Sequence, residues 1–141
     1  MVIIRPARLG DEGYIIQTWV DNFRDSALAH SLSGSLYNIR WKEIAFDLIS
    51  RCVVVVAYDE DYPDVIIGFA AFEYDGVTSA VLHYVYVRYT QRGAGVARDM
   101  LSLISDRHIV YTHRTTAAQK YTTEHSKLGW TYDFTRIWSR Q

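Results

Sequence analysis

The sequence predicts an α/β protein of the mixed type, with one central mixed β-sheet and helices on both of its faces. Three β-rich segments follow one another between residues 52 and 87 with only short turns between them, which requires antiparallel pairing. A helical pattern and a further β-rich segment come next, so the second half of the chain contains a β-α-β crossover with parallel strands. The 141 residues contain no repeats or linkers, so a single domain, residues 1–141, with one core is expected.

Two helices are expected in the first third of the chain. Val2–Arg5 is predicted to be a short strand, and Asp11–Phe23 a helix that Asp11 caps, because apolar residues recur in it at helical spacing. Arg24–Leu36 is a polar, serine-rich segment and predicts a loop. Tyr37–Ile49 again has its apolar residues on one helical face.

The pattern then changes to strands. Cys52–Tyr58 is short, apolar and β-branched, which is typical of a strand buried on both faces. Asp59–Asp64 contains a proline and several carboxylates and predicts a turn before the strand Val65–Tyr74. Asp75-Gly76 is a strong hairpin signal and predicts that Val77–Val87 returns as the partner strand.

The last third alternates helices and strands. A glycine turn leads into a helix over about Val96–Ser105, and a strand follows at Ile109–Tyr111. A helix over Thr115–Leu128 is expected to end at a glycine, before a final strand, Trp130–Trp138, that bends near Asp133. The expected order is therefore β-α-α-β-β-β-α-β-α-β.

Composition excludes several classes of function. A formal net charge of −1 gives no global attraction to nucleic acid or to an anionic membrane. The apolar runs are much shorter than the ~20 residues that span a bilayer, and the N-terminal residues contain no signal peptide pattern. Cys52 is the only cysteine, so an intrachain disulfide and a cysteine-rich metal site are excluded. A reducing, cytoplasmic location is expected.

The segment most informative about function is the glycine turn, Gln91–Ala97. A strand that enters a glycine turn at the start of a helix can hold phosphate, because the first helical N–H groups are unpaired and carry the positive end of the dipole. A Walker A loop requires Gly-Lys-Ser/Thr, but Val96 and Ala97 follow Gly95. A dinucleotide fingerprint requires a third glycine where Arg98 stands.

The turn resembles the acyl-coenzyme A loop of the GCN5-related N-acetyltransferase family. The segment from Gln91 to Gly95 fits that loop in register, the entering strand ends in Val85-Tyr86-Val87, and the expected element order agrees with the family's over nearly the whole chain. The alternative is an ordinary strand-turn-helix joint in which glycines allow tight packing. The resemblance implies an acyl-CoA-dependent N-acyltransferase that takes acetyl-CoA as co-substrate and acetylates a small-molecule or protein amine by direct attack.

The resemblance also implies how the cofactor is held. Backbone N–H groups from Arg92 to Ala97 would bind the pyrophosphate, and the backbone of Val85–Val87 would pair with the pantetheine arm at a splay beside Ile109–Tyr111. The implied cofactor-binding residues are Val85, Tyr86, Val87, Gln91, Arg92, Gly93, Ala94, Gly95, Val96 and Ala97.

The family's usual catalytic acid is replaced in this chain. The family commonly places a tyrosine two residues before a closing Lys-Leu-Gly-aromatic signature, which is present here as Lys127–Trp130, but His125 stands at the tyrosine position. A histidine can donate a proton near neutral pH. Tyr121, one helical turn earlier, is a second candidate for the acid. The alternative is that His125 is a partly exposed helix residue and that Tyr121 belongs to the core.

The family's usual catalytic base is also missing. Val77–Val87 contains no glutamate where the family often has one, but it contains His83. By strand alternation His83 is expected to share a face with Val81 and Val85, with the neighbouring tyrosines on the other face. His83 is a candidate base or substrate contact, and the alternative is a hydrogen-bonded core histidine.

Two further residues are weaker candidates. Glu73, across the hairpin, is expected either to bind a cationic amine or to be a solvated strand end. His113 follows the strand at the expected splay and is either a substrate contact or a loop residue. The five histidines lack metal-ligand spacing, so no metal site is predicted.

Two other functions remain open alongside acetyl transfer. The same fold can hold acyl-CoA without turnover, as a binding module, or it can serve a transferase that modifies nucleic acid. Many relatives carry one more strand at the end of the chain, whereas only three residues follow Trp138 here, so either that strand is lost or another subunit supplies it. An exposed sheet edge left by that loss would favour a homodimer.

Overall fold

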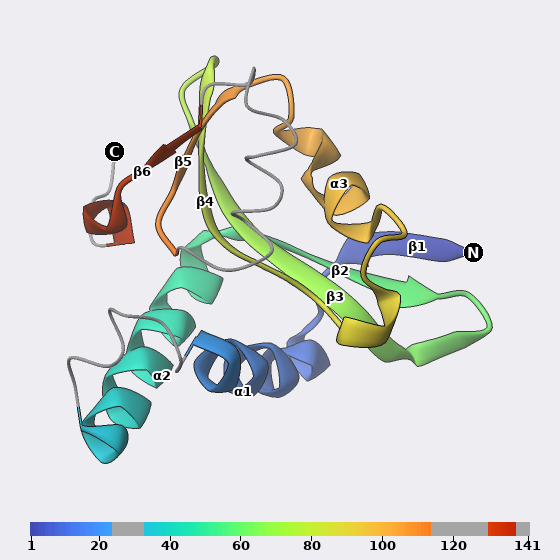
Figure 1. Ribbon diagram of the computed structural model, residues 1–141, viewed down its shortest axis with the longest axis horizontal. Helices are drawn as coiled ribbons and strands as arrows, with labels where there is room; N and C mark the ends of the chain where they lie inside the picture. Colours follow the sequence, from blue (N-terminus) through green and yellow to red (C-terminus); the bar gives the residue numbers. More distant parts are fainter. Residues whose placement is uncertain (24–32, 114–129, 138–141) are drawn as a thin grey trace.

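The computed structural model describes residues 1–23, 33–113 and 130–137, and these form a mixed β-sheet whose strands lie in sequence order, β1-β2-β3-β4-β5-β6 (Figure 1). Pairing is antiparallel from β1 to β4 and parallel from β4 to β6. The predicted mixed sheet is confirmed. The strands are Val2–Pro6, Val53–Asp59, Tyr62–Asp75, Ser79–Val87, His108–Tyr111 and Trp130–Tyr132.

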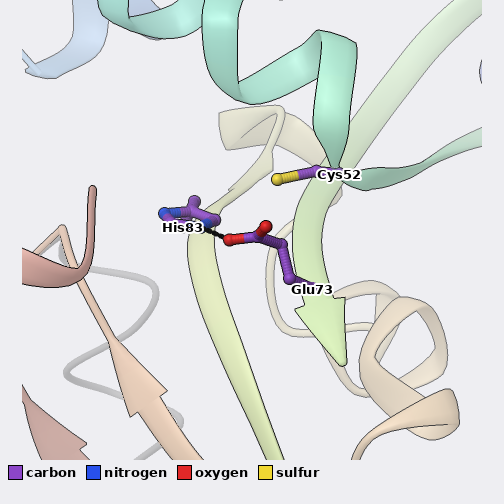
Figure 2. A group of neighbouring side chains, drawn as sticks. All are labelled: Cys52, Glu73 and His83. Carbon is purple, nitrogen blue, oxygen red and sulfur yellow. Dashed lines mark hydrogen bonds and ion pairs between the residues drawn. The ribbon is translucent and has the colours of Figure 1, made fainter. Parts of the chain in front are cut away.

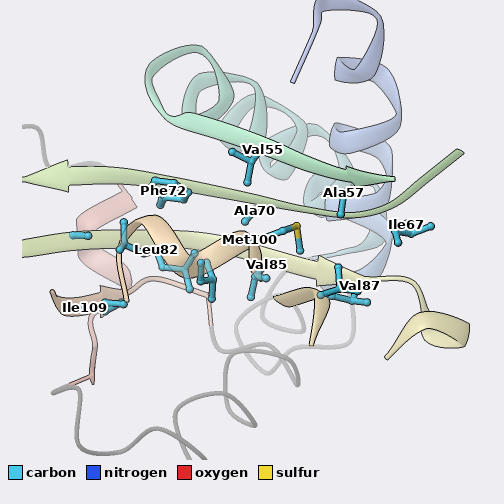
Figure 3. Close-up of a cluster of buried hydrophobic side chains, with 14 residues drawn as sticks. Val55, Ala57, Ile67, Ala70, Phe72, Leu82, Val85, Val87, Met100 and Ile109 are labelled. Carbon is cyan, nitrogen blue, oxygen red and sulfur yellow. The ribbon is translucent and has the colours of Figure 1, made fainter. Parts of the chain in front are cut away.

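Helices cover both faces of the sheet, as predicted. α1 (Glu12–Phe23) and α2 (Gly34–Arg51) lie on one face, and α3 (Val96–Met100) lies on the other (Figure 1). The buried apolar residues accordingly form two clusters, one on each face. Figure 3 shows the cluster on the α3 side, where side chains of β2 to β5 meet Met100.

Several boundaries differ from the predicted ones for local reasons. α2 begins three residues earlier than predicted, because the Ser33 hydroxyl accepts a hydrogen bond from the Leu36 N–H at 3.4 Å and caps the helix. Asp11 does not cap α1. It lies in a 3₁₀ turn, Leu9–Asp11, and its carboxylate binds the Arg5 guanidinium at 2.7 Å and the Arg8 N–H at 2.7 Å. The predicted turn Asp59–Asp64 is too long, since β3 already begins at Tyr62.

A β-bulge in β4 changes the predicted side-chain phase. Ala71 is paired with Tyr84 and Phe72 with Leu82, so His83 is an extra residue in the ladder. A bulge shifts the alternation by one residue. Leu82 and Val85 therefore both face α3. The prediction that His83 shares a face with Val85 is wrong, as is the prediction that Tyr84 lies on the opposite face from His83, because both lie on the α1/α2 side.

The helix predicted after the glycine turn is shorter than expected, whereas the next strand, β5, begins one residue earlier than predicted, at His108. α3 ends at Met100 and passes into a 3₁₀ turn, Leu101–Leu103, instead of reaching Ser105. Residues three apart lie on one side of a 3₁₀ turn, and Leu101 and Ile104 are both fully buried there.

The final strand is also shorter than predicted. β6 ends at Tyr132, and the predicted bend near Asp133 is present. The Asp133 carboxylate accepts hydrogen bonds from the N–H (3.0 Å) and hydroxyl of Thr135 and starts a 3₁₀ turn, η6 (Phe134–Ile137). The predicted helix Thr115–Leu128 and most of the predicted loop Arg24–Leu36 lie outside the described residues. Within the described ranges, no helix has the length and apolarity needed to cross a membrane.

Candidate functional site

The glycine turn after β4 requires glycine at two positions. Gly93 has φ of +88°, and Gly95, which precedes α3, has φ of +81°. Side chains with a Cβ rarely adopt this left-handed conformation. A Cβ on Gly93 would meet nothing within 4 Å, whereas one on Gly95 would lie 2.5 Å from the Arg98 guanidinium. Both glycines are therefore needed for their backbone conformation, since the atom near Gly95 is the far end of the exposed Arg98 side chain, which can move.

The turn presents a row of unpaired backbone donors. The Arg92 N–H donates to the Tyr89 carbonyl at 3.3 Å, and the Asp99 N–H donates to the Gly95 carbonyl at 3.0 Å. The N–H groups from Gly93 to Arg98 lie between these two donors in the sequence. Among the described residues, no backbone carbonyl outside α3 accepts a hydrogen bond from any of them. Such a row of donors is suited to an anion.

Among the described residues, the edge of β4 that faces β5 has no partner strand beside this turn. The last residues of β4 and β5 that pair are Leu82 and Tyr111. The last backbone hydrogen bond between the two segments runs from the Thr112 N–H to the Leu82 carbonyl, at 3.0 Å. Across the described residues, no backbone pair joins β5 to the segment from Tyr84 to Val87. The strands therefore part at Thr112, just beyond Ile109–Tyr111, the segment beside which the family resemblance implied a splay.

The backbone groups that face this open edge can be identified from the β3 ladder. The Arg88 N–H donates to the Ile67 carbonyl, so these residues form a hydrogen-bonded pair. Hydrogen-bonded and non-hydrogen-bonded pairs alternate along an antiparallel ladder. Val85 and Val87 therefore direct their N–H and C=O groups away from β3, toward the open edge. The Val87 carbonyl accepts a 2.8 Å hydrogen bond from Arg92 Nε. Val85 is the next residue of β4 whose backbone groups face away from β3, two positions before Val87.

The candidate base His83 is buried and has a partner on each ring nitrogen. Its side chain is fully buried; Nε2 lies 2.7 Å from Glu73 Oε2, and Nδ1 lies 3.0 Å from Thr112 Oγ1. Glu73 is in turn held by Arg51, whose guanidinium reaches both carboxylate oxygens at 2.9 and 2.8 Å. Arg51 also contacts Asp47 and the carbonyl of Ile137. Glu73 is therefore part of a network rather than a solvated strand end.

Burial and charge set the protonation states in this network. Burial lowers the pKa of His83, and the positive charges of Arg51 and Arg136 lower it further, which outweighs the opposing effect of Glu73. Burial alone would raise the pKa of Glu73, but its hydrogen bond to His83 and the charges of His83 and Arg51 lower it overall. A neutral imidazole next to a carboxylate is the state expected at neutral pH.

A second buried histidine continues the network. His113 Nδ1 lies 2.9 Å from Thr112 Oγ1, and Nε2 accepts a 3.3 Å hydrogen bond from Trp41 Nε1. Its ring is packed among the rings of Trp19, Phe23, Trp41 and Tyr84. Burial holds the pKa of His113 well below its usual range, and the nearby His83 lowers it further. His113 therefore follows β5 in a bend, as expected, but its side chain is buried and neutral.

The cluster of Cys52, Glu73 and His83 has the ligand types of a metal site. Their ligand atoms lie within 4.8 Å of one another, and Figure 2 shows the three side chains pointing toward a common point from the end of α2, β3 and β4. Imidazole, carboxylate and thiolate are all zinc ligands. However, the Arg51 guanidinium already binds both oxygens of the Glu73 carboxylate. Burial raises the pKa of the Cys52 thiol, and the negative charge of Glu73 raises it further. The satisfied His83–Glu73–Arg51 contacts favour a hydrogen-bonded network over metal coordination at this point.

The structure brings together only part of the predicted site. Tyr121 and His125, the candidate acids, lie outside the described residues. Tyr84 is a packing residue that stacks on Trp19 at a centroid distance of 4.8 Å. Arg51, Thr112 and the contact of Trp41 with His113 were not identified from the sequence. Their roles depend on contacts between residues at least 22 positions apart, for which the sequence contains no spacing signal.

Comparison with known proteins agrees with the predicted fold. No family model matches the chain, and no curated protein matches its sequence. Many solved structures do match. The histone acetyltransferase HPA2 and related acetyltransferase of Corynebacterium glutamicum is similar with a TM-score of 0.64 and 15% identity, over 87% of this chain and 82% of that chain.

Two structures with bound cofactor are also similar. The PaiA N-acetyltransferase of Thermoplasma acidophilum, in complex with coenzyme A, matches with a TM-score of 0.62 and 12% identity, over 88% of this chain and 87% of that one. The yncA acetyltransferase of Salmonella typhimurium, with its cofactor acetyl-CoA, matches with a TM-score of 0.55 and 20% identity, over 90% and 78%. At these identities the likeness establishes that this chain has the GCN5-related N-acetyltransferase fold.

Proposed function

We propose that this protein is an acetyl-CoA-dependent N-acetyltransferase that transfers acetyl directly to an amine. The observation that carries the proposal is the open edge of β4 at Val85 and Val87, which leads into the unpaired N–H groups of the Gly93–Arg98 turn. A ligand with an extended amide chain followed by a pyrophosphate fits this arrangement, because the amides can pair with the strand edge and the pyrophosphate can bind the N–H groups of the turn. Similar solved structures hold coenzyme A or acetyl-CoA, which supports the same cofactor here.

In this proposal the backbone of Val85–Val87 pairs with the pantetheine arm, and the turn from Gln91 to Ala97 holds the pyrophosphate. The donors come mainly from the turn, because α3 has only 5 residues and contributes little dipole of its own. Arg92 has to release the Val87 carbonyl for that group to pair with an amide of the arm. Its guanidinium is then free to bind phosphate.

The chemistry requires few groups. Holding an amine and a thioester in attack geometry supplies much of the rate enhancement, and a base takes the amine proton. We assign the base to the His83 network. The acid that protonates the leaving thiolate is proposed to be His125 or Tyr121.

A second candidate function is an acyl-CoA-binding module without turnover. It is favoured by the burial of His83 and by the engagement of both of its ring nitrogens. Thiol release in the presence of a panel of amines separates the two functions, since a binding module takes up acetyl-CoA and releases no coenzyme A.

The experiment that tests the cofactor site compares two glycine variants by calorimetric titration with acetyl-CoA. Gly93 and Gly76 both have positive φ and open space where a Cβ would lie, but Gly76 lies in the β3–β4 hairpin at the other end of β4. Gly93→Ala and Gly76→Ala should each lose about 1–2 kcal/mol of stability from the same backbone strain. Only Gly93→Ala should weaken acetyl-CoA binding, by tenfold or more. Equal binding by both variants would show that the turn does not hold the cofactor.

A further inference from the structure

The buried network has a fixed direction, because its two ends have fixed hydrogen-bonding roles. Trp41 Nε1–H can only donate a hydrogen bond, and the ionised Glu73 carboxylate can only accept one. Between them lie His113, Thr112 and His83, joined by contacts of 3.3, 2.9, 3.0 and 2.7 Å from one end to the other. Each group in between can donate to one neighbour and accept from the other.

These end groups determine both histidine tautomers. His113 Nε2 accepts from Trp41, so the His113 proton is on Nδ1, which lies 2.9 Å from Thr112 Oγ1. The His83 backbone also hydrogen-bonds to this imidazole. The Thr112 hydroxyl then donates to His83 Nδ1 at 3.0 Å, which is shorter than its alternative contact with the His83 carbonyl at 3.4 Å. The His83 proton is therefore on Nε2 and is donated to Glu73 Oε2.

Three members of this network repeat the order of contacts in a hydroxyl-imidazole-carboxylate triad. In such a triad a hydroxyl donates to a histidine whose other nitrogen donates to a carboxylate that stabilises the imidazolium. Thr112, His83 and Glu73 make these contacts, and Arg51 holds both oxygens of the carboxylate, including the one that His83 contacts. Thr112 also lies where β4 and β5 part, next to the open edge of β4.

We propose that Thr112, His83 and Glu73 form a proton-transfer triad that accepts the proton of the attacking amine at the point where β4 and β5 separate, with His113 and Trp41 as positioning residues that set its direction. This inference rests on the proposed acetyl transfer. It assigns the deprotonation to Thr112, whereas His83 acts behind it.

The proton balance of the step is simple. The neutral amine nitrogen attacks the acetyl carbonyl carbon, the carbon–sulfur bond breaks, and coenzyme A leaves as the thiolate, which takes its proton from the proposed acid. The nitrogen loses one proton to Thr112 Oγ1. Because Thr112 is completely buried, β4 and β5 have to move apart at this point to admit the amine. The hydroxyl proton of Thr112 passes to His83 Nδ1, which gives an imidazolium that Glu73 stabilises. After the amide leaves, the same path runs backward and returns the proton to water, which restores the original tautomers.

The histidine tautomers test the network independently of any activity. Two-bond ¹⁵N–¹H spectra of the full-length protein should show His113 protonated on Nδ1 and His83 protonated on Nε2. Trp41→Phe removes the donor at the end of the network and should change the His113 signals. Tyr37→Phe is the matched control: it removes a buried hydrogen bond from a neighbouring ring, the one to the Val20 carbonyl, and should leave the histidine signals unchanged. Opposite tautomers in the unmutated protein would overturn the proposal.

Kinetics of two Thr112 variants test the proton transfer. Thr112→Val keeps the shape of the side chain and should lower kcat about 10²-fold, with little change in the KM for acetyl-CoA. Thr112→Ser restores a hydroxyl and should recover most of the rate. In the unmutated protein, kcat/KM should decline as falling pH protonates His83. In Thr112→Val this part of the decline should be absent.

The pH profile has to be interpreted with all the groups that face His83. These are Glu73 from β3, Arg51 and Cys52 from the end of α2, Arg136 from η6, and Thr112 and His113 from the bend after β5. Thr112→Val leaves the other groups in place and removes only the hydroxyl path to His83.

The outcomes separate the triad from the proposed function. If acetyl-CoA does not bind, the proposed function fails, while the tautomer spectra still decide whether the network is directed as described. If the protein acetylates amines and Thr112→Val keeps the kcat and pH profile of the unmutated protein, the triad is wrong and the function stands. A stable acetyl group on Thr112, detected by mass spectrometry, would also overturn the triad, because it makes the hydroxyl a nucleophile.

Discussion

Arg51 and Glu73 form a two-pronged ion pair, with distances of 2.9 and 2.8 Å from one guanidinium nitrogen to the two carboxylate oxygens. The pair joins the last residue of α2 to the end of β3, and the same guanidinium contacts the carbonyl of Ile137 in η6. Only 9% of the Arg51 side chain and 23% of the Glu73 side chain are exposed. One arginine therefore connects a helix, the sheet and the segment after β6.

Removing this arginine should be strongly destabilising. Arg51→Met keeps most of the apolar side chain but leaves the Glu73 carboxylate with His83 alone, so we expect a loss of about 2–4 kcal/mol in the free energy of unfolding. Arg40→Met, on the same helix, is the control. Its ion pair with Glu43 is 3.7 Å long and exposed, so its loss should cost less than about 0.5 kcal/mol. Urea unfolding measures both, and equal losses would contradict a central role for Arg51.

Gly68 should be intolerant of any side chain. A Cβ at this position in β3 would lie 2.7 Å from the Tyr86 carbonyl oxygen and 3.1 Å from Met100 Cε, so Gly68→Ala should push β3 from β4 or α3 and cost about 1–3 kcal/mol. Gly13→Ala in α1 meets no atom within 4 Å and should stabilise the protein by about 0.5–1 kcal/mol. Thermal unfolding of the two variants should shift in opposite directions.

Most of the sheet could be predicted because its signals are local. The β-branched run at β2, the Asp75-Gly76 turn and the glycine turn after β4 identified three adjacent strands and a helix start, and the parallel crossover to β5 followed from them. The predicted side-chain directions were wrong where one extra residue in a strand shifted the alternation of side chains between the two faces of the sheet. The bulge at His83 has no sequence signature, and it reversed the predicted faces of the residues beyond it.

The site was harder to predict because its groups meet only in three dimensions. Periodicity singled out His83 as a polar residue in an apolar strand, but its function depends on Thr112, 29 positions away, and on Glu73, 10 positions away. A triad is defined by geometry and not by spacing. The contacts of Arg51 and of Trp41 could not be predicted, because the sequence does not show which side chains face each other across the sheet.

The two buried histidines should make stability fall below neutral pH. Burial lowers the pKa of His83 and His113 in the folded state, so between the folded values and the unfolded value near 6.5 the unfolded chain binds more protons. Stability is therefore full above about pH 6.5 and decreases as pH falls, by about 1.4 kcal/mol per pH unit for each proton. His113→Phe should remove one of these protons and reduce the slope of unfolding free energy against pH. Tyr37→Phe should lower the free energy without changing that slope, and an unchanged slope in His113→Phe would show that His113 does not carry this pH dependence.

Asp11 should add a separate loss of stability at lower pH. Its hydrogen bond to the Arg5 guanidinium, at 2.7 Å, lowers the pKa of the carboxyl in spite of the opposing effect of burial, and the Arg8 N–H lowers it further. A carboxyl with a lowered folded pKa stabilises the protein above its unfolded value, near 4, and loses that contribution as pH falls through the folded value. Asp11→Asn should therefore cost about 1–2 kcal/mol at pH 7 and progressively less below pH 4, so that the curves of the variant and the unmutated protein converge. Asp99→Asn, in an exposed 3.8 Å pair with Arg98, should change the free energy of unfolding at pH 7 by less than about 0.5 kcal/mol. A constant difference between Asp11→Asn and the unmutated protein from pH 7 to pH 3 would show that Asp11 acts through packing and not through its charge.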